Sequence, residues 1–189
     1  PEEGFDCDGN CVVEVDCEGV CGGSSSEDDC GVCGGDGSSC LASLSLGAFD
    51  SSGTLEVLYN FGSDVAGFQF DVSGLALAGG SGGAAGDAGF EVQTGGGTVL
   101  GFSFTGSTVP AGSGVLTVLS FTDVTADVTE LSLGNFGAVT SSDGSEFDVT
   151  TSGSVDHATD CAGTYYGDAA ADCAGDCGGS ALEDECGVC

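Results

Sequence analysis

The sequence predicts an all-β protein, an antiparallel sandwich flanked by irregular, disulfide-rich segments. Apolar and polar residues alternate with a period of two between residues 41 and 158, and no helical periodicity appears there. All 12 cysteines lie outside that range, within 7–40 and 161–189. We therefore divide the chain into a cysteine-rich repeat segment at 1–40, a sandwich at 41–158, and a second cysteine-rich segment at 159–189 that holds an incomplete copy of the repeat.

The flanking segments share a long repeat. Residues 16–33 (DCEGVCGGSSSEDDCGVC) and 172–189 (DCAGDCGGSALEDECGVC) have the same C-x3-C-x8-C-x2-C spacing, and 6–11 is a partial third copy. Their Gly and Asp-Gly pairs predict tight turns and little regular structure. The first copy continues through GGDGSSC to Cys40, whereas the second ends at Cys189. We expect further chain or another molecule to complete it.

The middle segment contains several short strands. Within residues 65–72, Phe68 and Phe70 share one face with Val72, while Gln69 and Asp71 take the other. The glycine-rich stretch 79–89 predicts a flexible loop. We expect a core of Phe, Leu and Val. The predicted strands are 41–47, 54–61, 65–72, 90–93, 98–105, 114–124, 129–134 and 146–151.

The charge of the chain is extreme: 31 Asp and Glu, one His, and no Lys or Arg. Such a chain cannot neutralise phosphates, so we expect no nucleic-acid partner, and an anionic membrane surface would repel it. Apolar stretches are too short for membrane insertion. Salt and divalent ions relieve the self-repulsion of the carboxylates. We predict an extracellular or cell-surface protein, and its start at Pro1 suggests a piece processed from an exported chain.

Cysteine-rich, loop-rich flanks are typical of disulfide-bonded exported proteins. The flanks hold odd numbers of cysteines, so a Cys40–Cys161 bond is the economical pairing; it requires the ends of the sandwich to lie side by side. Within a repeat we expect crossed bonds, with a four-thiolate zinc site as the rival interpretation. The predicted disulfide cysteines are Cys7, Cys11, Cys17, Cys21, Cys30, Cys33, Cys40, Cys161, Cys173, Cys177, Cys186 and Cys189.

Calcium is the one cofactor that the acidic clusters suggest. The Asp6–Asn10 segment is similar to the start of a calcium loop, although Gly9 comes too early for an EF-hand. Residues 27–29 and 183–185 are two further acidic clusters. Solvated acidic turns are the alternative interpretation of each cluster. The candidate calcium ligands are Asp6, Asp8, Asn10, Asp28, Asp29 and Asp184.

The sequence lacks the parts of an enzyme. One histidine and no lysine or arginine leave few general acids or bases. No G-x-S-x-G, H-E-x-x-H or phosphate-binding loop is present. We therefore predict that the protein is not an enzyme and name no catalytic residue. His157, at the edge of the sandwich among Asp and Thr, is predicted to be a surface residue.

The middle segment resembles a known family. GTLEVLYN (53–60), VAGFQFDVSG (65–74) and GFSFTGSTVPAGSGVLTVLSF (101–121) are similar to the cohesin-like sandwich of microbial surface and extracellular proteins. The resemblance implies about nine strands in a jelly-roll-like sandwich that binds proteins or carbohydrate. The flanks, CGVCGGDGSSC above all, resemble Cys-Gly-Asp repeats of secreted marine microbial proteins. A similar string occurs in secreted metalloproteases with thrombospondin motifs, but no metalloprotease motif accompanies it here.

Two functional hypotheses follow. The first is an extracellular structural protein whose matching ends join copies of itself head to tail into a filament or fibre. The alternative is a cohesin-type adhesion module on a cysteine-rich stalk, with a protein or a glycan as its ligand.

Overall fold

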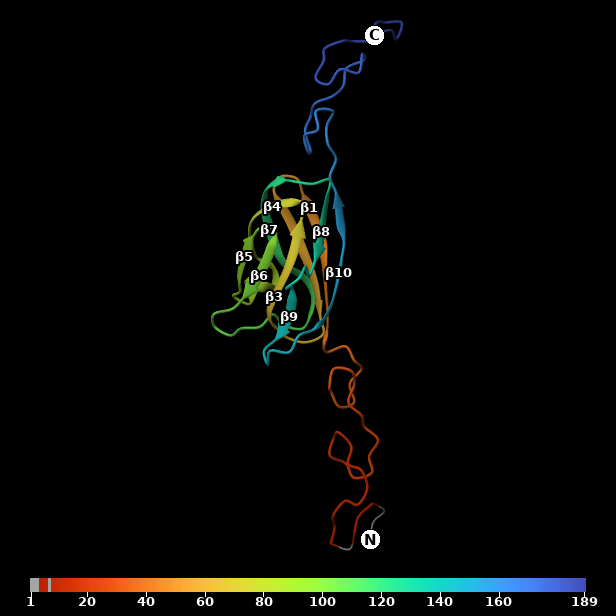
Figure 1. Ribbon diagram of the computed structural model, residues 1–189, viewed down its shortest axis with the longest axis vertical. Helices are drawn as coiled ribbons and strands as arrows, with labels where there is room; N and C mark the ends of the chain where they lie inside the picture. The colour runs from red at the N-terminus through yellow and green to blue at the C-terminus, as the bar shows by residue number, and fades with distance from the viewer. Residues whose placement is uncertain (1–3, 7) are drawn as a thin grey trace.

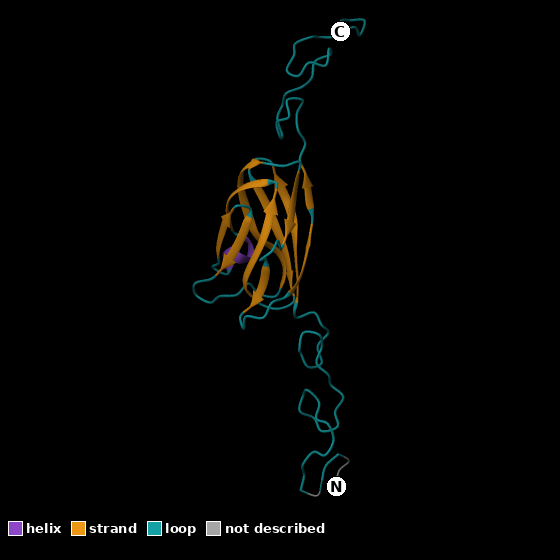
Figure 2. Ribbon diagram, viewed as in Figure 1, coloured by secondary structure: helices purple, strands orange, loops and turns teal. Residues whose placement is uncertain are grey.

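The computed structural model describes residues 4–6 and 8–189. It is elongated, with a β-sandwich in the middle and one irregular flank at each end (Figures 1 and 2). The elements are β1 (Leu41–Asp50), β2 (Thr54–Phe61), β3 (Val65–Ser73), β4 (Leu75–Ser81), α1 (Gly83–Asp87), β5 (Glu91–Gly95), β6 (Thr98–Phe102), β7 (Gly112–Val124), β8 (Val128–Ser132), β9 (Ala138–Ser141), β10 (Asp148–Ser152) and β11 (Ser154–Asp156). Within the described part of the chain, no helix is long and apolar enough to cross a bilayer.

Two sheets form the sandwich. The first has the strand order β10-β1-β2-β7-β4 and the second β11-β8-β3-β6-β5, with β9 also pairing with β3. The all-β sandwich is thus confirmed, with more strands than the nine expected. The stretch 79–89 is not a flexible loop, because β4 extends through Ser81 and α1 follows. Ala85 of α1 is fully buried in the core, and Gly80 packs so closely that a Cβ there would lie 2.5 Å from Val92 Cγ1.

β1 and β10 are neighbours that run in the same direction. Leu41 pairs with Asp148 at one end and Ser45 with Ser152 at the other, whereas the remaining pairs of named strands are antiparallel. Because the two strands are parallel, the chain enters the sandwich at one end and leaves it at the other. The flanks accordingly extend from opposite ends (Figure 1).

This arrangement overturns the predicted Cys40–Cys161 disulfide. Cys40 directly precedes β1, and Cys161 follows β11 at the far end of the sandwich. Cys40 bonds instead to Cys30, and Cys161 bonds to Cys177. The prediction failed because it required the two ends of the domain to lie side by side, which the parallel pairing of β1 with β10 prevents.

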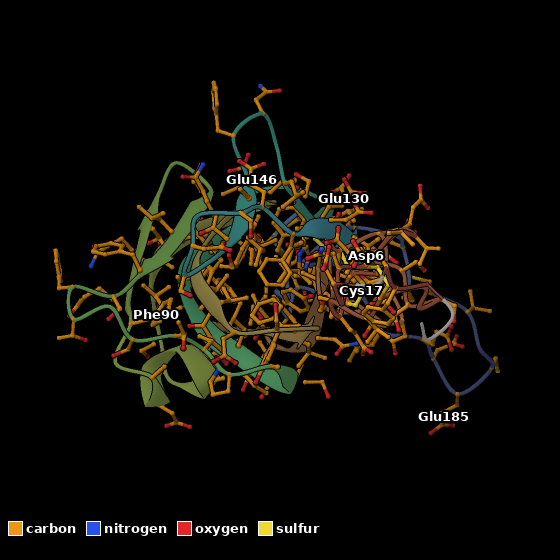
Figure 3. All side chains as sticks on the ribbon, turned by 90° about the horizontal axis from the view of Figure 1, so that it is seen from below. Asp6, Cys17, Phe90, Glu130, Glu146 and Glu185 are labelled. Atoms are coloured by element: carbon orange, nitrogen blue, oxygen red, sulfur yellow. A yellow bond between two sulfur atoms is a disulfide. The ribbon has the colours of Figure 1, made fainter. Side chains whose placement is uncertain are left out.

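Stacked phenylalanines fill much of the core. The ring of Phe68 lies 5.9 Å from those of Phe70 and Phe90, centroid to centroid. Gly101 lies against the ring of Phe68, where a Cβ would come within 2.0 Å of its Cζ. Acidic side chains such as Glu130 and Glu146 lie at the rim of the sandwich in the view along the long axis (Figure 3). The alternation of apolar and acidic residues along the strands therefore separates core from solvent.

Replacement of Phe70 by alanine should lower the free energy of unfolding by about 3–5 kcal/mol, because it leaves a cavity in a close-packed core. Phe104→Ala is the matched control, since Phe104 is 84% exposed and Phe70 0%; its effect should stay within about 0.5 kcal/mol. Urea denaturation with the disulfides intact, followed by far-ultraviolet circular dichroism, measures both values. Equal losses for the two variants would contradict this description of the core.

Candidate functional site: the flanks and their junctions with the sandwich

Each flank is built from copies of a unit that we call the aspartate turn, in which one carboxylate binds several backbone amides. In the unit of Asp28, Oδ1 accepts hydrogen bonds from the amides of Cys30 and Val32, both at 2.9 Å, and Oδ2 accepts one from Gly37 at 2.7 Å. Bonds to Oδ1 from the amides two and four residues on recur in every unit. The units begin at Asp6, Asp16, Asp28, Asp160, Asp172 and Asp184.

Glycines shape each aspartate turn. Gly31, three residues after Asp28, has φ 75°, and its amide donates to the Asp28 carbonyl at 2.9 Å. Glycine adopts this left-handed backbone conformation without the steric cost of a side chain. Gly35, seven residues after Asp28, lies so close that a Cβ would meet Asp28 Oδ2 at 2.1 Å. The Asp-x-x-Gly spacing is thus a structural requirement of the turn, and the same spacing recurs at all six aspartates.

The amides stabilise the charged form of these aspartates. The backbone N–H of Val32, then that of Gly37, lowers the pKa of Asp28 below its ordinary value. The amide of Val20 does the same to the pKa of Asp16, and the amide of Thr164 to that of Asp160. Since the chain has no Lys or Arg, backbone N–H groups supply the positive partial charge that these carboxylates need.

Disulfides link each unit to the next. Cys17–Cys33, Cys161–Cys177 and Cys173–Cys189 each span 16 residues, and Cys11–Cys21 and Cys30–Cys40 each span 10. Loops of roughly 15 residues closed in this way are expected to gain about 3 kcal/mol each on the chain-entropy model. The five cross-links among the described cysteines take the place of a hydrophobic core, which such short segments cannot form. They are typical of a protein that folds in an oxidising compartment.

The observed pairing agrees only partly with the prediction. Cys17–Cys33 and Cys173–Cys189 are the expected bonds within a repeat, but Cys21 and Cys30 pair outside it, with Cys11 and Cys40. All four cysteines of the first repeat are thus in disulfides rather than in a four-thiolate zinc site.

One of the predicted disulfide cysteines is not in a disulfide. Cys186 is an exposed free thiol, contrary to expectation. Its counterpart Cys30 bonds to Cys40 in the GGDGSSC segment, which has no equivalent after the second repeat in this sequence. Cys7 lies outside the described residues.

The predicted calcium ligands do not come together in one site. Asp6 and Asn10 belong to the first aspartate turn, where Asn10 Nδ2 donates to Asp6 Oδ2 at 2.9 Å. The carboxylates of Asp28 and Asp184 accept backbone amides, and Asp8 and Asp29 are exposed. Over residues 4–6 and 8–189, no three or more His, Cys, Asp or Glu are placed to share a metal ion. Calcium binding by these residues stays a prediction.

The N-terminal flank joins the sandwich through backbone contacts. The amide of Asp148 donates to the Cys40 carbonyl at 2.8 Å, and Ser63 Oγ donates to the Ser39 carbonyl at 2.7 Å. Gly62 lies so near the chain that a Cβ would meet the Ser38 carbonyl oxygen at 1.8 Å. The Cys30–Cys40 disulfide ties the last aspartate turn to the same place. This junction therefore positions the flank closely against β2 and β10.

The C-terminal flank joins the sandwich through His157. Only 7% of this residue is exposed, so the prediction of a surface histidine is wrong. Nε2 lies 2.7 Å from Thr129 Oγ1 on β8, and Nδ1 lies 2.7 Å from the Tyr166 hydroxyl on the flank. The ring of Phe49 packs at a centroid distance of 4.9 Å. These contacts bury the histidine between the sandwich and the flank.

Two tyrosines adapt the first C-terminal unit to this junction. Tyr165 stands where the other units have Cys11, Cys21, Cys33, Cys177 and Cys189. Its hydroxyl donates to Asp127 Oδ1 at 2.9 Å, so a side-chain contact with the sandwich replaces a disulfide. The signal was present in the sequence, because Asp160-x-x-Gly163 has the spacing of the other units. This unit was missed because the repeat was defined over 18 residues rather than over the Asp-x-x-Gly spacing.

Comparisons with known proteins give the chain no family. No protein-family model and no curated protein sequence matches it. Among solved structures, it is similar to a chain described as a non-cellulosomal cohesin from the hyperthermophilic archaeon Archaeoglobus fulgidus. The TM-score is 0.42 at 17% identity, over 59% of this chain and 86% of that one. The geometry of this chain alone therefore has to indicate its function.

Asp28→Ala should loosen one unit without unfolding the sandwich. The amides of Cys30, Val32 and Gly37 lose their acceptor, so their hydrogen exchange should accelerate by at least about tenfold, as expected for loss of roughly one hydrogen bond to a charged group. Asp29→Ala, which removes an exposed carboxylate next to it, is the control and should leave these amides unchanged.

Acid should act on the same amides. The pKa of Asp28 is lowered in the folded chain, so its contribution to stability is present above the ordinary value of 3.8 and is lost as pH falls through the folded value. Hydrogen exchange measured by mass spectrometry detects both the effect of the Asp28→Ala substitution and the effect of acid. Equal protection in the Asp28 and Asp29 variants would show that the carboxylate does not organise the turn.

Proposed function

We propose that this chain is an in-line structural module of an extracellular protein, a β-sandwich inserted in a disulfide-linked stalk and able to carry tension from one flank to the other. The observation that supports it best is the parallel pairing of β1 with β10, which sends the two flanks out of opposite ends of the sandwich. Tension applied to the flanks therefore passes through the sandwich along its strands.

The direction of the load decides how the sandwich resists it. A pull on the N-terminal flank acts on the start of β1, and a pull on the C-terminal flank acts on β10 through β11. The two neighbouring strands are drawn in opposite directions along their length. Hydrogen bonds of a parallel pair are evenly spaced and run across the strands at a slant, so a load along the strands strains those between residues 41–45 and 148–152 together. Strands peeled apart from one end would break the same bonds one after another.

The flanks suit the same role. Disulfides between successive aspartate turns limit how far each unit can extend before a covalent bond bears the load. The absence of Lys and Arg removes every cleavage site for trypsin-like proteases. Head-to-tail assembly of copies through the flanks is the finer prediction from the sequence, and flanks at opposite ends are the geometry that such a fibre requires.

Single-molecule pulling tests the proposal. Handles at residues 41 and 152 load β1 against β10 in shear, whereas handles at 41 and 148 peel the pair from its common end, because Leu41 is opposite Asp148. We expect a several-fold higher unfolding force in the first geometry. Equal forces in the two geometries would refute a load-bearing role for this strand pair.

A binding module carried by the stalk is the second candidate, favoured by two exposed aromatic side chains. Phe104 is 84% and Phe136 86% exposed, each on a connection outside the strands. Exposed aromatic rings can stack against the apolar face of a sugar. We propose glycans as the ligand class.

A glycan array probed with the wild-type chain tests this second candidate. The expected signal should be lost in a Phe104→Ala, Phe136→Ala double variant and kept in Leu182→Ala, which removes a side chain that is 85% exposed on the flank. No binding, or equal loss in the Leu182 control, would dismiss it.

A further inference from the structure

His157 makes more side-chain contacts than are needed to connect the flank to the sandwich. The ring is held at both nitrogens, by Thr129 of the sandwich and Tyr166 of the flank. Its faces and edges meet Phe49 at 4.9 Å, Tyr166 at 5.6 Å and Tyr165 at 6.3 Å, centroid to centroid. Phe49 in turn stacks on Phe121 and Tyr166. The chain's single histidine is thus the centre of the contact between the flank and the sandwich.

The backbone of the flank is distorted to make this contact. Tyr166 has φ 53°, the one non-glycine residue with positive φ in the described chain. Three other units have glycine at the corresponding place: Gly22, Gly34 and Gly178, with φ 69°, 66° and 69°. A side chain is disfavoured in that conformation, so the tyrosine must gain something that glycine cannot supply. Its hydroxyl on His157 Nδ1 and its ring on Phe49 are that gain.

A proton on His157 changes these contacts. The neutral ring donates from one nitrogen and accepts at the other, so one of the two hydroxyls accepts a hydrogen bond from the ring and the other donates one to it. The imidazolium has two N–H donors and no acceptor, and its charge would sit among Phe49, Tyr165 and Tyr166 with little access to water. Burial accordingly lowers the pKa of His157 below its ordinary 6.5, although the nearby Asp156 acts in the opposite direction.

The titratable groups near the ring come from both the sandwich and the flank. The elements packed around the ring contribute Asp50, Asp127, Glu130 and Asp156, and the flank contributes Tyr165 and Tyr166. Hydrogen bonding to Ser52 lowers the pKa of Asp50, and the bond to Asp127 raises the pKa of Tyr165, which moves both away from the range in which an imidazole titrates. Histidine is the side chain whose ordinary pKa lies between pH 5 and 7, so we assign a transition in that range to His157.

We propose that His157 is an acid-sensitive latch: the C-terminal flank is docked on the sandwich while the ring is neutral, and when the ring is protonated the flank can swing about the remaining Tyr165–Asp127 hydrogen bond. The docked state binds fewer protons than the released one, so docking is complete above the ordinary histidine pKa and weakens as pH falls below it. The N-terminal junction is made by backbone groups, Ser63 and a disulfide. Mild acid thus releases one flank and leaves the other fixed.

The composition makes the test direct. One histidine gives one imidazole signal, so proton–nitrogen correlation spectra of the intact chain report its pKa without assignment by mutation. The chain has three tyrosines and no tryptophan, and two of the tyrosines lie at this junction, so near-ultraviolet circular dichroism reports on docking. Small-angle X-ray scattering follows the angle between flank and sandwich. We expect a pKa below 6.5, with the dichroism and scattering changes at the same midpoint.

Variants separate the latch from general acid effects. His157→Gln cannot take up a proton, so both changes should vanish between pH 7 and 5. Tyr166→Phe loses the hydroxyl on Nδ1 and should show the released scattering profile already at pH 7. Tyr59→Phe removes the one tyrosine away from the junction and should behave as wild type. If His157→Gln does not fold, the wild-type titration and the Tyr166 variant still decide.

The latch would be disproved by an imidazole pKa at or above 6.5, by titration without a change in shape, or by the same transition in the glutamine variant. Pulling at pH 7 through the sandwich is independent of these measurements. Loss of the latch would therefore leave the load-bearing proposal intact, and the reverse also holds.

Discussion

β1 and β10 lie side by side and run in the same direction, and the position of both flanks follows from that pairing. In a sandwich closed by antiparallel terminal strands, the two ends of the chain emerge together. Here the register from Leu41–Asp148 to Ser45–Ser152 separates them by the length of the strands. The stalk is therefore continuous through the sandwich, and the sandwich becomes a part of the stalk rather than a branch from it.

A second constraint comes from the absence of Lys and Arg. Thirty-one carboxylates must be stabilised by water, hydroxyls and backbone amides. In the aspartate turn, the carboxylate that needs stabilisation also orders the backbone. It accepts hydrogen bonds from the amides two and four residues further along and, in four of the units, from the amide nine residues further along. Disulfides then join the ordered turns. The described residues of the flanks form neither a helix nor a core, yet they obtain a defined geometry in this way, with glycines where the backbone passes closest to the carboxylate.

Sequence reasoning predicted the features that depend on local pattern. The alternation around Phe68 and Phe70 identified a strand of the core, and the cysteine-rich flanks identified the cross-linked segments. It did not predict pairings that depend on topology: Cys40–Cys161 was excluded by a parallel strand pair that no local pattern reveals.

His157 was also missed, because its burial depends on Thr129 and on two flank tyrosines brought to it by the fold. The stretch 79–89 was misjudged for a related reason. Its small residues form β4 and α1 because they fit beneath Val92 and into the core, and glycine-rich composition alone does not show that.

The disulfide map of the native protein is a direct test of the parallel pairing of β1 with β10, since it reports which cysteines are neighbours. Peptic digestion at acid pH, where thiolate exchange is suppressed, avoids scrambling by Cys186 and needs no Lys or Arg. With the flanks at opposite ends, we expect Cys17–Cys33, Cys30–Cys40, Cys161–Cys177 and Cys173–Cys189, with every bond confined to one flank. A peptide that joins Cys40 to Cys161 would place both flanks at one end of the sandwich and contradict it.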